Sequence, residues 1–218
     1  MSKKMNFRGL MARIITPLVF ALIGYLLLFA AFGSYITPIA GVWSLITSGS
    51  KIYEGESLME NRLDGYTDAV PSSVVTFPKY GDCYGELRIP SAQIKAPLYY
   101  GDNEALLKKG VCQYLGSMYI GSGTTALLSG HNNTYLHTLG QVAVGDKIKV
   151  DTNYGSYVYE VEKVGVYKAS DTSWYDLAAT EENLVIYTCY PFNALGITQY
   201  RYAVNARYIS GPRILYEE

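Results

Sequence analysis

Three residues in this chain, Cys189, His131 and Arg201, are of types that could together form a catalytic site. A cysteine thiol attacks as the thiolate, so it needs a neighbouring base or cation to raise its thiolate fraction at neutral pH. Cys189 ends a short apolar run at residues 183–188, NLVIYT, and a Tyr-Pro pair follows it. Arg201 lies twelve positions further on, and His131 lies far upstream. This set predicts a nucleophilic cysteine enzyme in which an imidazole and a guanidinium assist the thiol.

The elements around these residues place them at strand ends. The run at residues 183–188 is β-branched and short, which favours a buried strand that ends at the cysteine. A second candidate strand, TTALLS at residues 124–129, ends just before Gly130 and His131. Residues 201–209, RYAVNARYI, form the last predicted strand, which begins with the arginine. Strand ends are rigid platforms for exposed side chains.

The remaining pattern predicts a mainly β domain. From about residue 77, short strands are punctuated by glycine and proline. We expect further strands at residues 84–89, 93–100, 147–151 and 156–168, the last two forming a hairpin, and a short helix at residues 102–109. Seven or eight short strands with few helices favour a closed or nearly closed β-barrel.

The N-terminal segment predicts a membrane anchor. Residues 14–32 contain no charged residue, and about 20 apolar residues match the hydrocarbon core of a bilayer. Four basic residues and no acidic one precede this stretch, so the N-terminus should be cytoplasmic and the rest of the chain extracellular, in a single pass through the cell membrane. Small residues after the stretch leave a cleaved signal peptide as the alternative, although the stretch is longer than a usual signal segment.

These signals divide the chain into four parts. We expect a cytoplasmic tail at residues 1–13, a transmembrane anchor at 14–36, a membrane-proximal arm or linker at 37–78 and a catalytic β-barrel domain at 79–218. Within the arm, residues 53–66 predict a solvated helix. Four of the 18 basic residues precede the anchor, which leaves 14 against 19 acidic residues in the exported part. That acidic balance argues against nucleic acid as a partner.

The cysteine and histidine counts bound the remaining chemistry. Three cysteines are an odd number for an exported chain, so at least one has no partner within the chain. Cys83 and Cys112 form either a disulfide or two buried, inert thiols. His131 and His137 lie six residues apart with no acidic cluster, which makes a poor metal site. We therefore expect neither a metal nor another cofactor.

The order His131, Cys189, Arg201 on an exported, many-stranded domain resembles the sortases. These are membrane-anchored cysteine transpeptidases that attach surface proteins to the cell wall of Gram-positive bacteria. The resemblance covers about residues 85–210 and is carried by GELRIPSAQIKAPLYYG, LLSGHNNTYLHTLGQVAVGDKIKV, VIYTCYP and RYAVNARYI. Of the family's TLxTC motif, Thr188 and Cys189 match, while Val185 and Ile186 stand where threonine and leucine are usual. The TCYP run, the N-terminal anchor and the polar tail at 211–218 look most like class D.

The resemblance implies a role for each residue. Cys189 would attack the threonine carbonyl of a sorting signal resembling Leu-Pro-x-Thr-Gly and form a thioacyl-enzyme intermediate. His131, which follows a glycine as in the family, would act as acid and base, and Arg201 would hold the substrate and the oxyanion. Arg207 is the rival arginine but lies mid-strand. His137 is the rival histidine, but it lacks the preceding glycine and lies in a predicted short helix.

The implied partners are sorting-signal-bearing surface proteins, an amine of peptidoglycan or of its lipid-linked precursor, and the cytoplasmic membrane. Candidate substrate contacts are Thr188 and, in the loop at residues 168–182, Trp174 and Tyr175. Both aromatic residues equally suit the packing of a surface helix.

Three other functions compete with transpeptidation. Water in place of the amine would make the protein a hydrolytic cysteine peptidase. A cysteine L,D-transpeptidase is disfavoured, because it would show a Ser-His-Gly-Cys run where this chain has IYTC at residues 186–189. A non-enzymatic anchored β-domain with an inert cysteine is the third.

Overall fold

The computed structural model describes residues 15–28, 62–63, 65–192, 194 and 198–217. The chain divides into two units, residues 1–40 and residues 41–218. In the first unit, residues 15–28 form an α-helix. No helix within the described ranges is both long enough and apolar enough to cross a membrane. The predicted tail at 1–13 and all but the last residues of the predicted helix at 53–66 lie outside the described residues.

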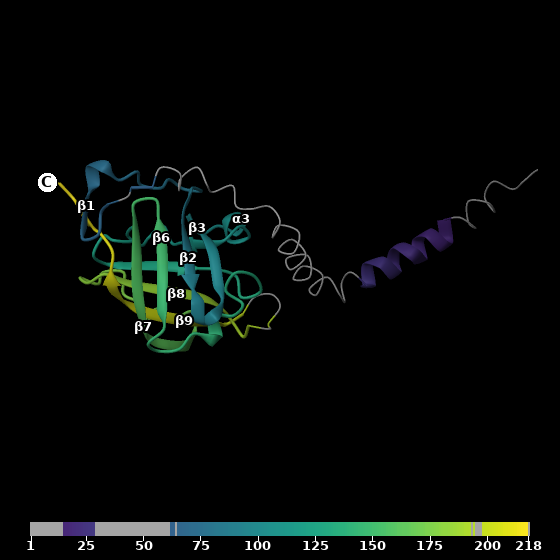
Figure 1. Cartoon of the computed structure of the whole chain (residues 1–218). Coiled ribbons are helices and arrows are strands. Elements are labelled where there is room, and N and C mark those ends of the chain that lie inside the picture. Colours follow the sequence, from purple (N-terminus) through teal and green to yellow (C-terminus); the bar gives the residue numbers. More distant parts are fainter. Residues whose placement is uncertain (1–14, 29–61, 64, 193, 195–197, 218) are drawn as a thin grey trace, which may run out of the picture. The chain divides into compact units, whose positions relative to one another are not determined.

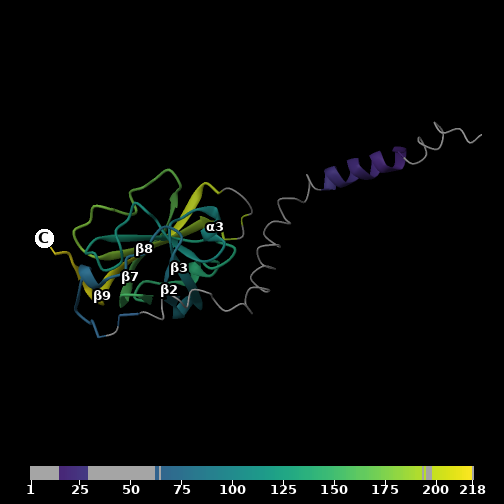
Figure 2. The same cartoon turned by 90° about the horizontal axis from the view of Figure 1, so that it is seen from above.

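An eight-stranded closed barrel forms the second unit (Figures 1 and 2). Its strands are joined in the order β2-β3-β4-β5-β8-β9-β7-β6. Their bounds are β2 (Cys83–Ile89), β3 (Ile94–Tyr100), β4 (Val111–Gln113), β5 (Thr125–Ser129), β6 (Lys147–Thr152), β7 (Gly155–Lys168), β8 (Asn183–Tyr190) and β9 (Tyr200–Ser210). The predicted mainly β barrel is confirmed, and each of the seven predicted strands falls on a strand of the barrel.

The helices that the structure describes between residues 62 and 217 are short. They are the 3-10 turns η1 (Ser72–Val74), η2 (Pro90–Ala92) and η3 (Leu139–Gln141), and the single-turn helix α3 (Glu104–Leu107). α3 begins after Asn103, whose side-chain oxygen accepts a hydrogen bond of 2.8 Å from the backbone N–H of Leu106. This N-cap satisfies a donor that the first turn leaves without a partner. The helix predicted around His137 is wrong, because residues 132–138 form turns.

The barrel interior holds the main hydrophobic core. Leu184 and Ile186 of β8 point into it, as do Leu128 of β5 and Val204 of β9. The largest side chains buried there include four tyrosines, Tyr84, Tyr154, Tyr157 and Tyr159. Burial raises the pKa of all four hydroxyls, so they stay protonated donors. These four tyrosines therefore fill the core of the barrel, and they do not form a ligand-binding platform on its surface.

The segment before the barrel packs against the barrel's own turns. β1 (Ala69–Pro71) pairs in parallel with β10 (Arg213–Leu215), so this segment and the C-terminal tail form a two-stranded sheet. Leu63 donates its backbone N–H to the carbonyl of Asn153 in the β6–β7 turn, at 2.9 Å. The Asn153 side chain in turn donates to the carbonyl of Thr76, at 2.9 Å.

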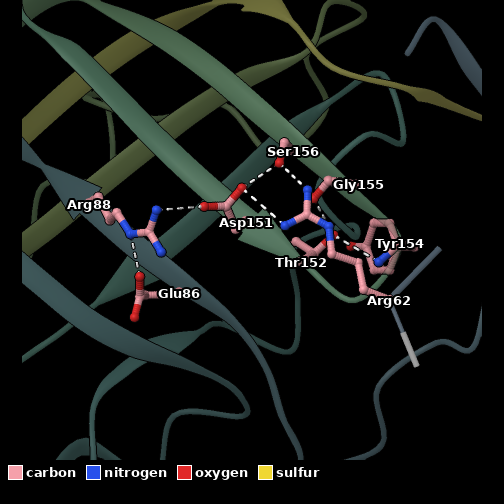
Figure 3. Close-up of polar contacts among 8 residues, drawn as sticks. All are labelled: Arg62, Glu86, Arg88, Asp151, Thr152, Tyr154, Gly155 and Ser156. Carbon is pink, nitrogen blue, oxygen red and sulfur yellow. Dashed lines mark hydrogen bonds and ion pairs between the residues drawn. The ribbon is translucent and has the colours of Figure 1, made fainter. Parts of the chain in front are cut away.

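Charged side chains reinforce this attachment on the outer surface of β2 and β6. Figure 3 shows Arg62 and Arg88 on either side of Asp151. Arg62 Nη1 lies 3.5 Å from Asp151 Oδ1, and Arg62 Nη2 donates to Ser156 Oγ. Arg88 Nη1 lies 3.3 Å from Asp151 Oδ2. Arg88 also pairs with Glu86. Partly exposed pairs of this kind each contribute about 0–1 kcal/mol, so they align the segment more than they stabilise the fold.

Candidate active site

β8 carries the cysteine on the outer face of the barrel. Successive side chains of a strand point to opposite faces. Leu184 and Ile186 enter the interior core, whereas Val185 and Tyr187 join a second apolar cluster on the outer face. Cys189 is two residues beyond Tyr187, so it shares that outer face. It is half-buried at the end of the strand.

The strand register brings the three segments that carry the predicted residues side by side, and we refer to His131, Cys189 and Arg201 as the row. Cys189 is directly opposite Arg201 in the antiparallel pair β8–β9. On the other side of β8, the parallel pair with β5 matches Tyr187 to Ser129. His131 follows this last matched pair by two residues, in the segment that leaves β5 next to the end of β8. Histidine, cysteine and arginine thus come from three adjacent segments, with the cysteine in the middle.

Two hydrogen bonds extend the β5–β8 pairing beyond the last ladder residue. Gly130 donates its backbone N–H to the carbonyl of Tyr187 at 3.3 Å. The Thr188 hydroxyl donates to the carbonyl of Gly130 at 2.6 Å, and the Thr188 side chain is buried. The residue before the histidine is therefore bound to the two residues before the cysteine. The Thr188 side chain therefore fixes the position of Gly130.

Arg201 is held by the chain just ahead of it. Its Nη1 donates to the carbonyls of Tyr200 and Thr198, at 2.9 and 3.1 Å, and to Thr198 Oγ1 at 3.2 Å. Within the described part of the chain, its Nε and Nη2 have no hydrogen-bond partner. The guanidinium is thus fixed through one nitrogen and keeps its other donors for a ligand.

His131 has an acidic neighbour. Its Nε2 lies 3.7 Å from Glu104 Oε2 at the start of α3, and its side chain is 28% exposed. Glu104 is itself 67% exposed, so solvent weakens the interaction between the two side chains.

The other two cysteines sit in a different environment. Cys83 and Cys112 both lie opposite Tyr99, one on each side of β3, so a full strand separates them. No disulfide joins any of the three cysteines, all of which the structure describes. Burial raises the pKa of Cys112 to about 12, so its thiol stays protonated at neutral pH. Of the two alternatives left open by the sequence, buried thiols is the one the structure shows.

Trp174 and Tyr175 lie further along the same outer face. Trp174 is buried against Leu127, Val185 and Ala203. Its ring centroid is 4.6 Å from that of Tyr175, 5.2 Å from Tyr187 and 5.9 Å from Tyr167. Both residues border a hollow of about 250 Å³ between the loop at residues 169–182 and the sheet. Because Val185 also lines it and lies four residues before Cys189, the hollow is roughly 13 Å from the thiol along β8.

The rival residues lie elsewhere. Arg207 is opposite Asn183, six positions from the cysteine row, and its Nη2 binds Glu160 Oε1 at 2.6 Å. His137 is exposed, and its Nδ1 lies 2.6 Å from the carbonyl of Thr134 in its own turn. None of the described His, Cys, Asp and Glu side chains gather in a group of three that could hold a metal ion.

Three polar residues at the site went unrecognised in the sequence: Glu104, Thr198 and Asn132. Asn132 directly follows the histidine, and its Nδ2 donates to the carbonyl of Pro191 at 3.0 Å. Adjacency to His131 was the one signal that marked it. Glu104 and Thr198 carry no such signal, because their contacts arise from a helix start and a loop end that only the fold brings to the row.

Comparison with known proteins agrees with this geometry. A family model described as the sortase domain matches residues 87–209. Sortase D of Bacillus subtilis (strain 168) is 31% identical over 144 residues, which cover 66% of this chain and 73% of that protein. The crystal structure of sortase C1 from Streptococcus agalactiae has a TM-score of 0.53 and 27% identity, and covers 57% of this chain and 66% of that one.

A sortase D5 transpeptidase of Clostridium perfringens has a TM-score of 0.56 and covers 72% of this chain and 90% of that one. At 21% identity this likeness shows the fold alone. The relatives confirm the resemblance seen in the motifs, including the likeness to class D.

Proposed function

The chain belongs to the sortase family of cysteine transpeptidases, and from this we propose that it cleaves an LPxTG-like sorting signal and transfers the surface protein to an amine of the cell wall. The observation that supports this proposal most directly is that Cys189 lies opposite Arg201 in the β8–β9 pair, while His131 follows the strand that pairs with β8 on its other side. The comparisons support the reaction class, and the substrate and the residue roles are part of the proposal.

In the first half of the reaction, the Cys189 thiolate attacks the carbonyl carbon of the threonine in the sorting signal. Negative charge develops on the carbonyl oxygen, and the donors of Arg201 that face no protein acceptor stabilise it. His131 gives a proton to the departing glycine amine as the C–N bond breaks. The products are a thioacyl enzyme and the released C-terminal part of the signal.

In the second half, an amine of peptidoglycan or of its lipid-linked precursor attacks the thioester. His131 now removes the proton from the attacking amine, and Cys189 leaves as the thiolate. One imidazole serves both halves of the reaction. It loses a proton in the first half and regains one in the second. No cofactor enters either step.

The substrate's upstream residues extend along the outer face of β8. An extended peptide rises by about 3.4 Å per residue, so the leucine, three positions before the threonine, reaches roughly 10 Å from the thiol. The hollow beside Trp174 and Tyr175 lies about one residue further along β8, and these two rings form its aromatic side. We assign these two residues to contact with the leucine end of the signal.

The test is a product analysis with the full chain in detergent. A peptide containing an LPxTG signal is mixed with the protein, with and without triglycine or hydroxylamine. We expect the amide or hydroxamate with an amine present, and a thioacyl adduct on Cys189. Acid as the only product in every arm would identify a hydrolytic peptidase, and no turnover would identify a non-enzymatic domain.

Matched variants test the residue roles in the same assay. Cys189→Ala should abolish the adduct, and an adduct recovered from it would refute the assignment. Arg201→Ala should lower kcat/KM by about 10²–10³, the usual effect of losing an oxyanion donor. Arg207→Ala and His137→Ala are the controls and should stay near wild type, because both side chains lie away from the row. His131→Ala should be slow in both halves.

A further inference from the structure

We propose that Asn132 is a positioning residue that sets the placement of His131 beside Cys189. This inference rests on the proposed function for its meaning. Asn132 is 8% exposed, and its Nδ2 donates to the carbonyl of Pro191 at 3.0 Å. It directly follows the histidine, and Pro191 is two residues beyond the cysteine. One buried amide therefore ties the two chemically active segments together.

The histidine–cysteine pair is bound on both sides. Before the pair, Thr188 Oγ1 donates to the carbonyl of Gly130. After the pair, the bond from Asn132 to Pro191 is the one hydrogen bond among the described residues that joins residues 131–138 to residues 189–194. The parallel ladder has already ended at Ser129 and Tyr187. Without the Asn132 amide, the separation of the two segments would be fixed on one side alone.

The accepting carbonyl belongs to a tight turn. Pro191 O also accepts from the backbone N–H of Ala194, at 3.1 Å. Asn132 therefore binds the same carbonyl as Ala194, so a shift of its side chain changes the position of Pro191 relative to His131. A misplacement of about 1 Å at a catalytic group costs on the order of 10² in rate.

The expected effect is on turnover. Asn132→Ala should lower kcat by about 10–100-fold in both acylation and amine transfer, because His131 acts in both. The KM for the sorting peptide should change little, because the hollow beside Trp174 lies roughly 13 Å away along β8. Asn133→Ala and Asn133→Asp are the matched controls. Asn133 is the same residue type one position on, is half-buried, and makes no side-chain hydrogen bond to a described residue.

Asn132→Asp gives a pH signature that a loss of packing would not. An ionised aspartate cannot donate to the Pro191 carbonyl and repels it, whereas a protonated one donates as asparagine does. An aspartate usually titrates near about 3.9, and burial raises that value. The activity of Asn132→Asp divided by that of Asn132→Ala should therefore rise as the pH falls from about 8 towards about 5. The charged or titratable side chains near position 132 are His131, Glu104, Cys189 and Arg201, and the same measurement on Asn133→Asp and Asn133→Ala corrects for the effect of a new carboxylate on them.

A second measurement decides the inference without any substrate. The measurement is the rate at which iodoacetamide alkylates Cys189 in the full chain, with thermal unfolding recorded alongside. This rate depends on how the His131 imidazole is placed relative to the thiol. Asn132→Ala should move this rate to that of His131→Ala, with Asn133→Ala at the wild-type rate. A wild-type alkylation rate and wild-type kcat in Asn132→Ala would overturn the inference, as would a ratio independent of pH. Absence of turnover in the wild-type protein would instead refute the proposed function, and alkylation would still decide the role of Asn132.

Discussion

At the scale of single residues, Arg201 depends on its neighbour Thr198. The three acceptors of Nη1 come from residues 198–200, so the guanidinium is oriented by the end of the loop that follows the cysteine. Thr198 Oγ1 also donates to the carbonyl of Tyr200 at 3.2 Å, so the acceptors of Nη1 are themselves joined by a hydrogen bond. The arginine is therefore presented to the thiol by a small polar cluster and not by its strand alone.

Replacing Thr198 by valine should slow the reaction. The change keeps the side-chain shape and removes the acceptor oxygen, so Nη1 loses one of its three partners. A hydrogen bond to a charged group contributes about 1.5 kcal/mol or more, so kcat/KM should fall roughly tenfold. Thr198→Ser should recover most of the loss in the same peptide assay, and Thr67→Val, at an exposed threonine, should have no effect. A serine variant as slow as the valine variant would contradict the role of the hydroxyl.

At the scale of elements, Glu182 joins three parts of the barrel just before β8. Its Oε1 accepts from the backbone N–H of Gly121 at 2.9 Å and from the Tyr159 hydroxyl at 2.8 Å. Its Oε2 accepts from the backbone N–H of Gly123 at 2.6 Å. One buried carboxylate thus connects the β4–β5 loop, β7 and the start of the strand that carries the cysteine.

This carboxylate should make stability depend on pH. Burial raises the pKa of Glu182, although its three hydrogen bonds lower it in part. With a raised pKa, the folded state binds the proton more tightly than the unfolded state does. The contribution to stability is therefore full below the usual glutamate pKa and is lost as the pH rises through the folded value. The free energy of unfolding of wild type, relative to the non-titrating Glu182→Gln, should decrease from about pH 4 to about pH 7.

Urea denaturation of both proteins at several pH values measures this difference. Glu182→Gln should also be destabilised by about 1–3 kcal/mol, because an amide nitrogen then faces a backbone N–H that it cannot accept from. Glu181→Gln, at the exposed neighbouring glutamate, is the control and should follow wild type at every pH. A pH-independent difference between wild type and Glu182→Gln would refute the titration.

The sequence predicted the longer elements well and missed the shortest ones. β7 and β9 are 14 and 11 residues long, and the first seven residues of β7 alternate between buried and more exposed positions, which is enough to show a period of two. β4 has three residues, VCQ, and becomes a strand because β3 and β5 lie on either side of it. β1 and β10 pair over three positions although they are far apart in the chain, so the polar tail gave no sign of a strand. Such short strands depend on tertiary pairing, which local pattern does not encode.

The site divides in the same way. His131, Cys189 and Arg201 could be proposed from the sequence, because reactive residue types at predicted strand ends, in the order found in the family, single them out. Asn132, Thr198 and Glu104 are common polar residues whose importance lies in which atoms they reach. Those contacts depend on turn geometry and on the β5–β8 register, and neither is specified by residue type.

At the scale of the whole molecule, we propose that the apolar segment near the N-terminus holds the enzyme at the cell membrane. The full chain should stay in the membrane fraction after alkaline carbonate extraction, and protease added outside should reach the barrel. Leu22→Arg should weaken retention, because an arginine at the centre of a span costs about 2.5–3.5 kcal/mol, whereas Leu22→Ala should not. Recovery of a soluble product that lacks the N-terminal residues would establish the cleaved signal peptide instead.

The position of Trp174 beside the hollow allows peptide binding to be followed by the protein's own fluorescence. The chain has two tryptophans, Trp43 and Trp174, so Trp43→Phe leaves a single indole fluorophore beside the hollow. Because Trp174 is only 8% exposed, a peptide in the hollow should change the intensity of indole emission through the rings packed against it, rather than by displacing water. Binding of a peptide against Trp174 should therefore change the fluorescence recorded in a stopped-flow experiment. In Cys189→Ala this signal measures association without chemistry and without any added dye.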